Sequence, residues 1–172
     1  MKCFFSGGVA VLAMALAAAA LAFSGFVPVA ADRYGPIDSR LDSALGRVSR
    51  ASIRRQALRS VNPVGSDPAA LAEGLDAYRE SCLSCHGAGK IAPAEFAAGL
   101  NPPAPSLGSK EIQAMSDGEL FWTISHGIRA TGMPAFSSSR EDREIWKIAA
   151  FLRHLPRLTD AESERLRFRG RN

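Results

Sequence analysis

The residues with the clearest chemical meaning are Cys82, Cys85 and His86, which lie in the segment Cys82-Leu83-Ser84-Cys85-His86. Two thiols three positions apart can each add to one vinyl group of a porphyrin, which gives two thioether bonds at one edge of the ring. The imidazole that follows at once is then carried to the iron as an axial ligand. The pattern predicts one covalently attached c-type haem, with His86 as an iron ligand.

Other chemistry for the same motif is less consistent with the rest of the chain. A structural zinc site needs a second ligand pair, whereas outside the motif only Cys3, His126 and His154 are available, in separate segments. A thioredoxin-like thiol pair belongs in a strand–helix–strand unit, and no strand pattern surrounds Cys82. A disulfide between the two cysteines would leave His86 unexplained.

The first 31 residues predict export from the cytoplasm. Met1–Ala31 contains one base, Lys2, and no acid, and it includes an apolar run of 19 residues from Val9 to Val27. Val29-Ala30-Ala31 is a small-residue pattern suited to signal cleavage before Asp32. The run is also long enough to cross a bilayer, so a retained membrane anchor is the alternative. Both interpretations place the remaining chain outside the cytoplasm.

Charge is distributed unevenly along the 172-residue chain, whose formal net charge is +4. Residues 32–61 hold seven arginines and three acids, a net of +4, whereas residues 67–157 hold nine bases and eleven acids, a net of −2. No stacking aromatics accompany the basic segment, so it does not indicate nucleic-acid binding. We divide the chain into a signal peptide or anchor, a basic amphipathic linker helix, a haem domain and a charged C-terminal tail, at residues 1–31, 32–66, 67–157 and 158–172.

Residues 41–61 are predicted to form the basic amphipathic helix of the linker. Its apolar positions are Leu41, Leu45, Val48, Ile53, Leu58 and Val61. One interpretation is a helix that lies on an anionic membrane surface or docks on a partner subunit. The other is a spacer helix that packs on its own domain and exposes its arginines to water.

The haem domain is predicted to be all-α. Asp67 as N-cap and Pro68 at the first position predict a helix to Ser81. Ser116 and Glu119 form a capping-box pattern at the start of a second helix over residues 117–127. A third helix is expected over residues 140–154, and no segment alternates with the period of a strand.

Residues 71–155 resemble a class I cytochrome c, in the monohaem subgroup that is similar to haem-bearing subunits of bacterial respiratory oxidase complexes. The resemblance rests on the following residues: Gly74, Tyr78, Cys82 to His86, Pro105-Ser106-Leu107, Gly132-Met133-Pro134 and the helix Trp146-Lys147-Ile148-Ala149-Ala150-Phe151-Leu152. It implies a few helices wrapped around one haem c bound through Cys82 and Cys85. It also implies that Ile148 and Phe151 meet Gly74 and Tyr78 where two helices cross.

The second axial ligand is expected to be Met133. Among the methionines after the start residue, Met14 lies in the leader, and Met115 precedes a predicted helix, where a core role is the ordinary one. Met133 lies in a glycine- and proline-containing turn, and the resemblance implies that a methionine in this setting is the distal ligand. His126 is the competing residue.

The resemblance further implies that the Pro105 carbonyl orients the ring of His86 and that Leu107 packs on the haem. Trp122, Trp146 and Arg129 are weaker candidates for contacts with the haem propionates, and core packing is the default for the two tryptophans.

With both axial positions filled, the predicted function is one-electron transfer and not catalysis. The expected partners are redox proteins, namely a quinol-linked donor complex and a terminal oxidase or dehydrogenase, and the expected location is the periplasm, soluble or anchored by residues 9–27. Two alternatives remain: a haem subunit of a larger oxidoreductase complex, and a haem enzyme or gas sensor with an open iron position.

Overall fold

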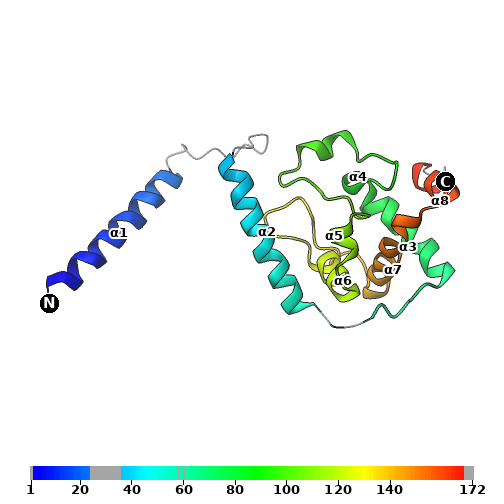
Figure 1. Ribbon diagram of the computed structural model, residues 1–172, viewed down its shortest axis with the longest axis horizontal. Coiled ribbons are helices and arrows are strands. Elements are labelled where there is room, and N and C mark those ends of the chain that lie inside the picture. Colours follow the sequence, from blue (N-terminus) through cyan, green and yellow to red (C-terminus); the bar gives the residue numbers. More distant parts are fainter. Residues whose placement is uncertain (1, 24–35, 58, 60, 169–172) are drawn as a thin grey trace. The chain divides into compact units, whose positions relative to one another are not determined.

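The computed structural model describes residues 2–23, 36–57, 59 and 61–168, and all regular structure in these ranges is helical (Figure 1). The helices are α1 (Lys2–Phe23), α2 (Pro36–Gln56), α3 (Pro68–Ser81), α4 (Leu83–His86), η1 (Glu95–Gly99), α5 (Lys110–Gln113), α6 (Asp117–His126), α7 (Asp142–His154), η2 (Leu155–Arg157) and α8 (Asp160–Arg167). The described residues contain no strand and a single isolated bridge, between Ala88 and Ile91. The all-α prediction is therefore confirmed.

The chain divides into two compact units, residues 1–33 and residues 34–172. The first unit contains α1, which carries much of the apolar run of the leader. Within the described residues, no helix combines the length and the apolar character that crossing a membrane requires. The end of the apolar run and the expected cleavage position before Asp32 lie outside the described residues.

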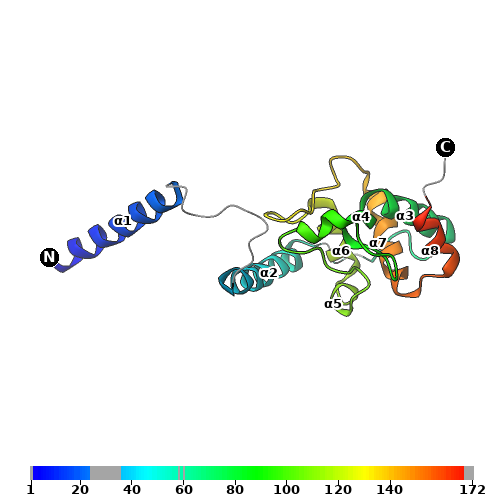
Figure 2. The same cartoon turned by 90° about the horizontal axis from the view of Figure 1, so that it is seen from above.

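The second unit is organised by the contact between α3 and α7, which lie side by side in both views (Figures 1 and 2). Gly74 of α3 lies against the backbone of Lys147, so that a Cβ at this position would lie 2.2 Å from the Lys147 carbonyl oxygen. One turn further on, the rings of Tyr78 and Phe151 pack with centroids 5.3 Å apart. Ile148 is fully buried beside them. The predicted crossing of these two helices is confirmed.

The predicted helix starts of the haem domain also match the structure, with small shifts. The Asp67 carboxylate accepts hydrogen bonds from the N–H groups of Ala69 and Ala70, and Ser116 and Glu119 form the reciprocal capping box of α6. The third predicted helix, α7, begins at Asp142 and not at 140, because the Arg140 N–H bonds to the carbonyl of Phe136 and leaves Glu141 as the capping residue. Phe121 and Trp146 join α6 to α7 as a stacked pair with centroids 4.3 Å apart.

The linker helix is displaced from its predicted range of 41–61. It begins at Pro36, because proline is favoured in the first turn of a helix, and it ends at Gln56. Asn62 then donates from its N–H to Asp117 Oδ2 at 3.2 Å and from Nδ2 to the Trp146 carbonyl at 2.7 Å. These two bonds hold the chain on the haem domain in a non-helical path. Of the predicted apolar stripe, Ile53 is buried while Val48 and Val61 are exposed.

The segment that the charge pattern sets apart as a tail contains a packed helix, α8. Thr159 and Glu162 cap this helix, and His154 Nε2 lies 2.9 Å from Glu162 Oε1. Leu166 is one of the most deeply buried side chains, and Arg165 pairs with Asp76 of α3. Charge counting missed this helix because a single leucine among acids and arginines carries its attachment to the core.

Substituting Gly74→Ala is expected to reduce the free energy of unfolding by about 1–3 kcal/mol or more, because the new methyl group would overlap backbone that cannot move without separating α3 from α7. Gly46→Ala in α2 is the matched control, since its Cβ would have only the end of the Arg50 side chain nearby, at 3.6 Å. The control should be neutral or stabilising by up to about 1 kcal/mol. Equal effects in urea denaturation would contradict the close-contact explanation.

Substituting Leu166→Ala is expected to cost about 2–4 kcal/mol of unfolding free energy, because the leucine is buried against the domain core. Phe168→Ala removes a larger but exposed side chain two residues away and should change stability by less than about 0.5 kcal/mol. Thermal or urea unfolding of both variants checks this assignment. If Leu166→Ala left the free energy of unfolding unchanged, the packing of α8 would not contribute to stability.

Candidate haem-binding site

The cysteine–histidine motif follows directly from α3. The N–H of Cys82 bonds to the Tyr78 carbonyl at 2.8 Å, which ends α3, and the short helix α4 begins at Leu83. The Cys82 carbonyl then accepts from the N–H groups of Cys85 and His86 at 3.1 and 3.0 Å. Residues three and four apart share one side of a helical turn. The structure therefore groups both thiols and the imidazole on one turn.

The two thiols are not joined to each other. Both cysteines are free, with Cys82 buried and Cys85 half-buried. Burial raises the pKa of the Cys82 thiol to about 12; Arg140 opposes this increase and Cys85 adds to it. Thiol–disulfide exchange needs a thiolate near neutral pH, so the buried Cys82 is a poor nucleophile for such exchange.

His86 is held by one of its two ring nitrogens. Its Nδ1 lies 2.8 Å from the carbonyl oxygen of Pro105, with Nδ1–H as the donor in this pairing. Burial lowers the pKa of His86, and the bond to Pro105 opposes this shift. An imidazole whose Nδ1 is held by a carbonyl presents Nε2 as a ligand, which is the usual arrangement of metal-binding histidines.

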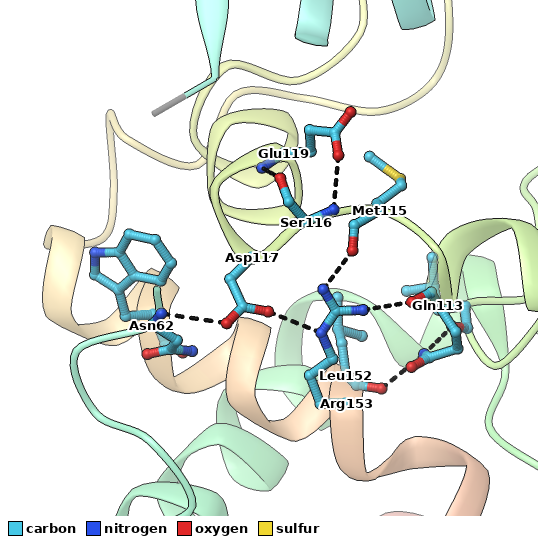
Figure 3. A network of polar contacts seen from close by, with 10 residues as sticks. Asn62, Gln113, Met115, Ser116, Asp117, Glu119, Leu152 and Arg153 are labelled. Carbon is cyan, nitrogen blue, oxygen red and sulfur yellow. Dashed lines mark hydrogen bonds and ion pairs between the residues drawn. The ribbon is translucent and has the colours of Figure 1, made fainter. Parts of the chain in front are cut away.

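The loop that carries Pro105 and Leu107 is fixed by a polar network that the sequence analysis did not identify (Figure 3). The Gln113 side chain donates to the carbonyls of Leu107 and Leu152, at 2.8 and 2.9 Å. Arg153 of α7 donates to Asp117 Oδ1 at 2.8 Å and to the Gln113 carbonyl at 2.7 Å, and it also bonds to the carbonyl of Met115. The network ties the loop to α7. No local motif marks these polar residues, because their partners are distant in sequence.

Met133 lies in a turn that is closed by its own hydrogen bonds. Thr131 Oγ1 accepts from the Met133 N–H at 3.1 Å and donates to the Ile128 carbonyl at 2.7 Å. Gly127, at φ +65°, begins this segment, and a Cβ there would lie 2.6 Å from the carbonyl carbon of Pro134. The Met133 side chain is half-buried and packs on the same core cluster as Cys82 and Leu107. These three predicted site residues therefore adjoin one core.

Among the other candidate residues, Met115 packs on the same core cluster as Met133, in the core role expected for it. His126 is exposed, its Nδ1 pairs with the Trp122 carbonyl at 3.0 Å, and its ring stacks on the Trp122 indole at 4.5 Å. Trp146 is buried in its stack with Phe121. Arg129 is exposed in the loop that precedes Met133.

Comparison with known proteins places this domain in context. The family model described as cytochrome C oxidase, cbb3-type, subunit III matches residues 69–152. The chain is 33% identical over 97 residues to the cbb3-type cytochrome c oxidase subunit CcoP of Azospirillum brasilense. The aligned region covers 56% of this chain and 32% of the relative. Residues 69–152 form a class I c-type cytochrome domain.

A second relative agrees with this assignment. The cbb3-type cytochrome c oxidase subunit FixP of Rhizobium etli is 32% identical over 109 residues, which cover 56% of this chain and 35% of the relative. The chain thus spans about one third of the length of either relative. The cofactor of the cytochrome domain is covalently bound haem c. The donor set fits this group, because it combines two free thiols with an imidazole whose Nδ1 is already paired.

Tyr78 connects the helix crossing to the turn that holds Cys82, Cys85 and His86. Its buried hydroxyl donates to the carbonyl of Gly87, the residue after His86, at 2.5 Å. Burial raises the pKa of Tyr78 far above its ordinary value, and the nearby Cys82 adds to this effect. The phenol therefore remains a hydrogen-bond donor throughout the neutral and moderately alkaline range.

Substituting Tyr78→Phe is expected to reduce the free energy of unfolding by about 1–3 kcal/mol, because the buried Gly87 carbonyl loses this donor. Ser138→Ala serves as the control, since it removes an exposed hydroxyl that donates to the Ala135 carbonyl. The control should stay within about 0.5 kcal/mol of the parent protein. A Tyr78→Phe protein as stable as the control would contradict a structural role for the hydroxyl.

Proposed function

We propose that this protein transfers one electron at a time between respiratory redox partners, on a haem c ligated by His86 and Met133. The observation that carries the proposal is the placement of Cys82, Cys85 and His86 on one helical turn, with His86 Nδ1 paired to Pro105. When bound, the haem supplies a one-electron Fe(III)/Fe(II) couple. No bond of a substrate is made or broken in this function.

Each residue of the proposed site has a separate task. Cys82 and Cys85 would hold the porphyrin through thioether bonds. His86 would bind the iron through Nε2, and the Pro105 carbonyl fixes the orientation of its ring. The soft thioether of Met133 would be the second iron ligand, and a soft donor would favour the reduced iron and raise the reduction potential. Leu107 would pack on the porphyrin and limit the access of water to it.

The proposed partners follow from the chemistry and from the relatives. A His/Met-ligated haem suits transfer from a quinol-linked donor complex to a terminal oxidase or dehydrogenase. The two relatives are named as subunits of cbb3-type oxidases, which favours a place beside, or within, a membrane-bound oxidase. The apolar N-terminal segment is typical of a signal peptide or anchor. It supports a periplasmic location for the cytochrome domain, soluble or anchored through residues 9–27.

A fixed subunit of an oxidoreductase complex is the second candidate, and it is favoured by the same relatives. In that case the electron path is the same, but the partner remains bound. A haem enzyme or sensor with an open iron position receives less support. The candidate distal histidine, His126, is exposed, and its ring stacks on the Trp122 indole.

Substituting Met133→Ala in the haem-loaded protein is expected to remove the long-wavelength absorption band of ferric iron bound to sulfur. The reduction potential should fall by on the order of 100 mV, within the ~0.8 V range that axial ligands span. The reduced variant should also bind carbon monoxide, which the parent protein should exclude. Visible spectra and a redox titration check these outcomes.

Met115→Leu is the matched control, because Met115 is also a half-buried methionine that contacts the core. Its band and potential should remain those of the parent protein. Loss of the band in Met115→Leu, with retention in Met133→Ala, would transfer the ligand role to Met115. Ready carbon monoxide binding by the parent protein would instead overturn the electron-carrier proposal in favour of an open iron position.

A further inference from the structure

The basic charge of the protein is concentrated in α2 and the residues that follow it. From Ser43 to Ser66 the chain has five arginines and no acidic residue. All five are exposed, namely Arg47, Arg50, Arg54, Arg55 and Arg59. The neighbouring residues 67–157 carry a net charge of −2. An anionic surface would therefore attract the α2 side of this unit and repel the cytochrome domain.

One side of α2 is already used by the domain. Ile53 is buried, and α2 lies against α6. Arg54 Nε pairs with Glu119 Oε1 of α6 at 3.5 Å. This side explains how α2 is attached, and it leaves the opposite side of the helix available.

The opposite side of α2 combines apolar surface with arginines. At about 100° per residue, Val48, Ala51 and Arg55 lie on the side away from Ile53. All three are exposed, and Val48 retains 67% of its accessible surface. Arg47 and Arg54, seven residues apart, follow one border of this strip. We call Val48, Ala51, Arg47 and Arg55 the outer face of α2.

We propose that the outer face of α2 binds an anionic lipid bilayer and orients the cytochrome domain on it. Arginine stems can lie along an apolar surface while their guanidinium groups reach the phosphates. An exposed apolar strip bordered by arginines is the pattern of a helix that lies in the membrane interface. A purely ionic contact with an acidic protein would not require the exposed Val48.

The position of α2 in the chain supports the same occupant. The apolar run of residues 9–27 ends only nine residues before Pro36. A retained anchor would keep α2 close to the lipid headgroups, and a cleaved leader would leave α2 as the first helix of the mature protein. The inference concerns lipid binding alone, so it stands or falls separately from the proposed electron transfer.

The test is cosedimentation of the haem-loaded protein with phosphatidylcholine vesicles, with and without phosphatidylglycerol. Binding to the neutral vesicles measures any contribution of the apolar leader. We expect anionic vesicles to bind more tightly, with an affinity that falls as salt is raised. The variant Arg47→Gln/Arg55→Gln should bind anionic vesicles about fivefold more weakly per arginine, on the order of 25-fold in total. Val48→Ser should weaken binding severalfold at unchanged charge.

The matched control is Arg143→Gln/Arg157→Gln, which removes the same charge from exposed positions of α7 and η2. It should keep nearly full binding, and unchanged haem spectra would show that both variants are folded. An equal loss in the control, or equal binding to neutral and anionic vesicles, would overturn the proposal. Salt-sensitive binding of the same arginines to an acidic protein, without preference for anionic vesicles, would assign the outer face to a protein partner and would also overturn it.

Discussion

The structure depends on the close approach of α3 and α7 at Gly74. Without a side chain at this position, the α3 backbone reaches the Lys147 carbonyl, and the helices come close enough for Tyr78 to pack on Phe151. The same approach sets where α3 ends. Tyr78 accepts the last helical bond from Cys82 and donates its hydroxyl to Gly87. The position of the turn that holds Cys82, Cys85 and His86 is therefore tied to the helix crossing.

The second support of the site comes from the other end of α7. Arg153 and the Leu152 carbonyl hold Gln113, and Gln113 holds the Leu107 carbonyl. Pro105, two residues before Leu107, faces His86 Nδ1. One helix thus braces both the turn that carries His86 and the loop that orients it. Such bracing suits a site that must change charge without a change of shape, because rigid surroundings reduce reorganisation.

The distribution of charge along the chain and the packing of the core set different boundaries between its segments. Residues 32–61, which include α2, carry a net charge of +4, whereas residues 67–157 carry a net charge of −2. α2 is nevertheless packed on α6 through Ile53, and α8, with its alternating charges, is attached through Leu166. A charged surface segment therefore does not mark a boundary of the packed unit. In both helices a buried apolar side chain contacts the core, and an ion pair of Arg54 or Arg165 accompanies it.

Local patterns in the sequence determined the attachment motif, the all-α class and the starts of α3 and α6, because caps and thiol spacing act within a single turn. The crossing at Gly74 was also predictable, through the resemblance. Only the tertiary structure decided that α2 ends before Asn62, that α8 packs on α3, and that Gln113 and Arg153 secure the loop of Pro105. Apart from the bond between Gln113 and Leu107, six positions apart, these features depend on contacts between residues 36 to 89 positions apart, whose partners no local pattern identifies.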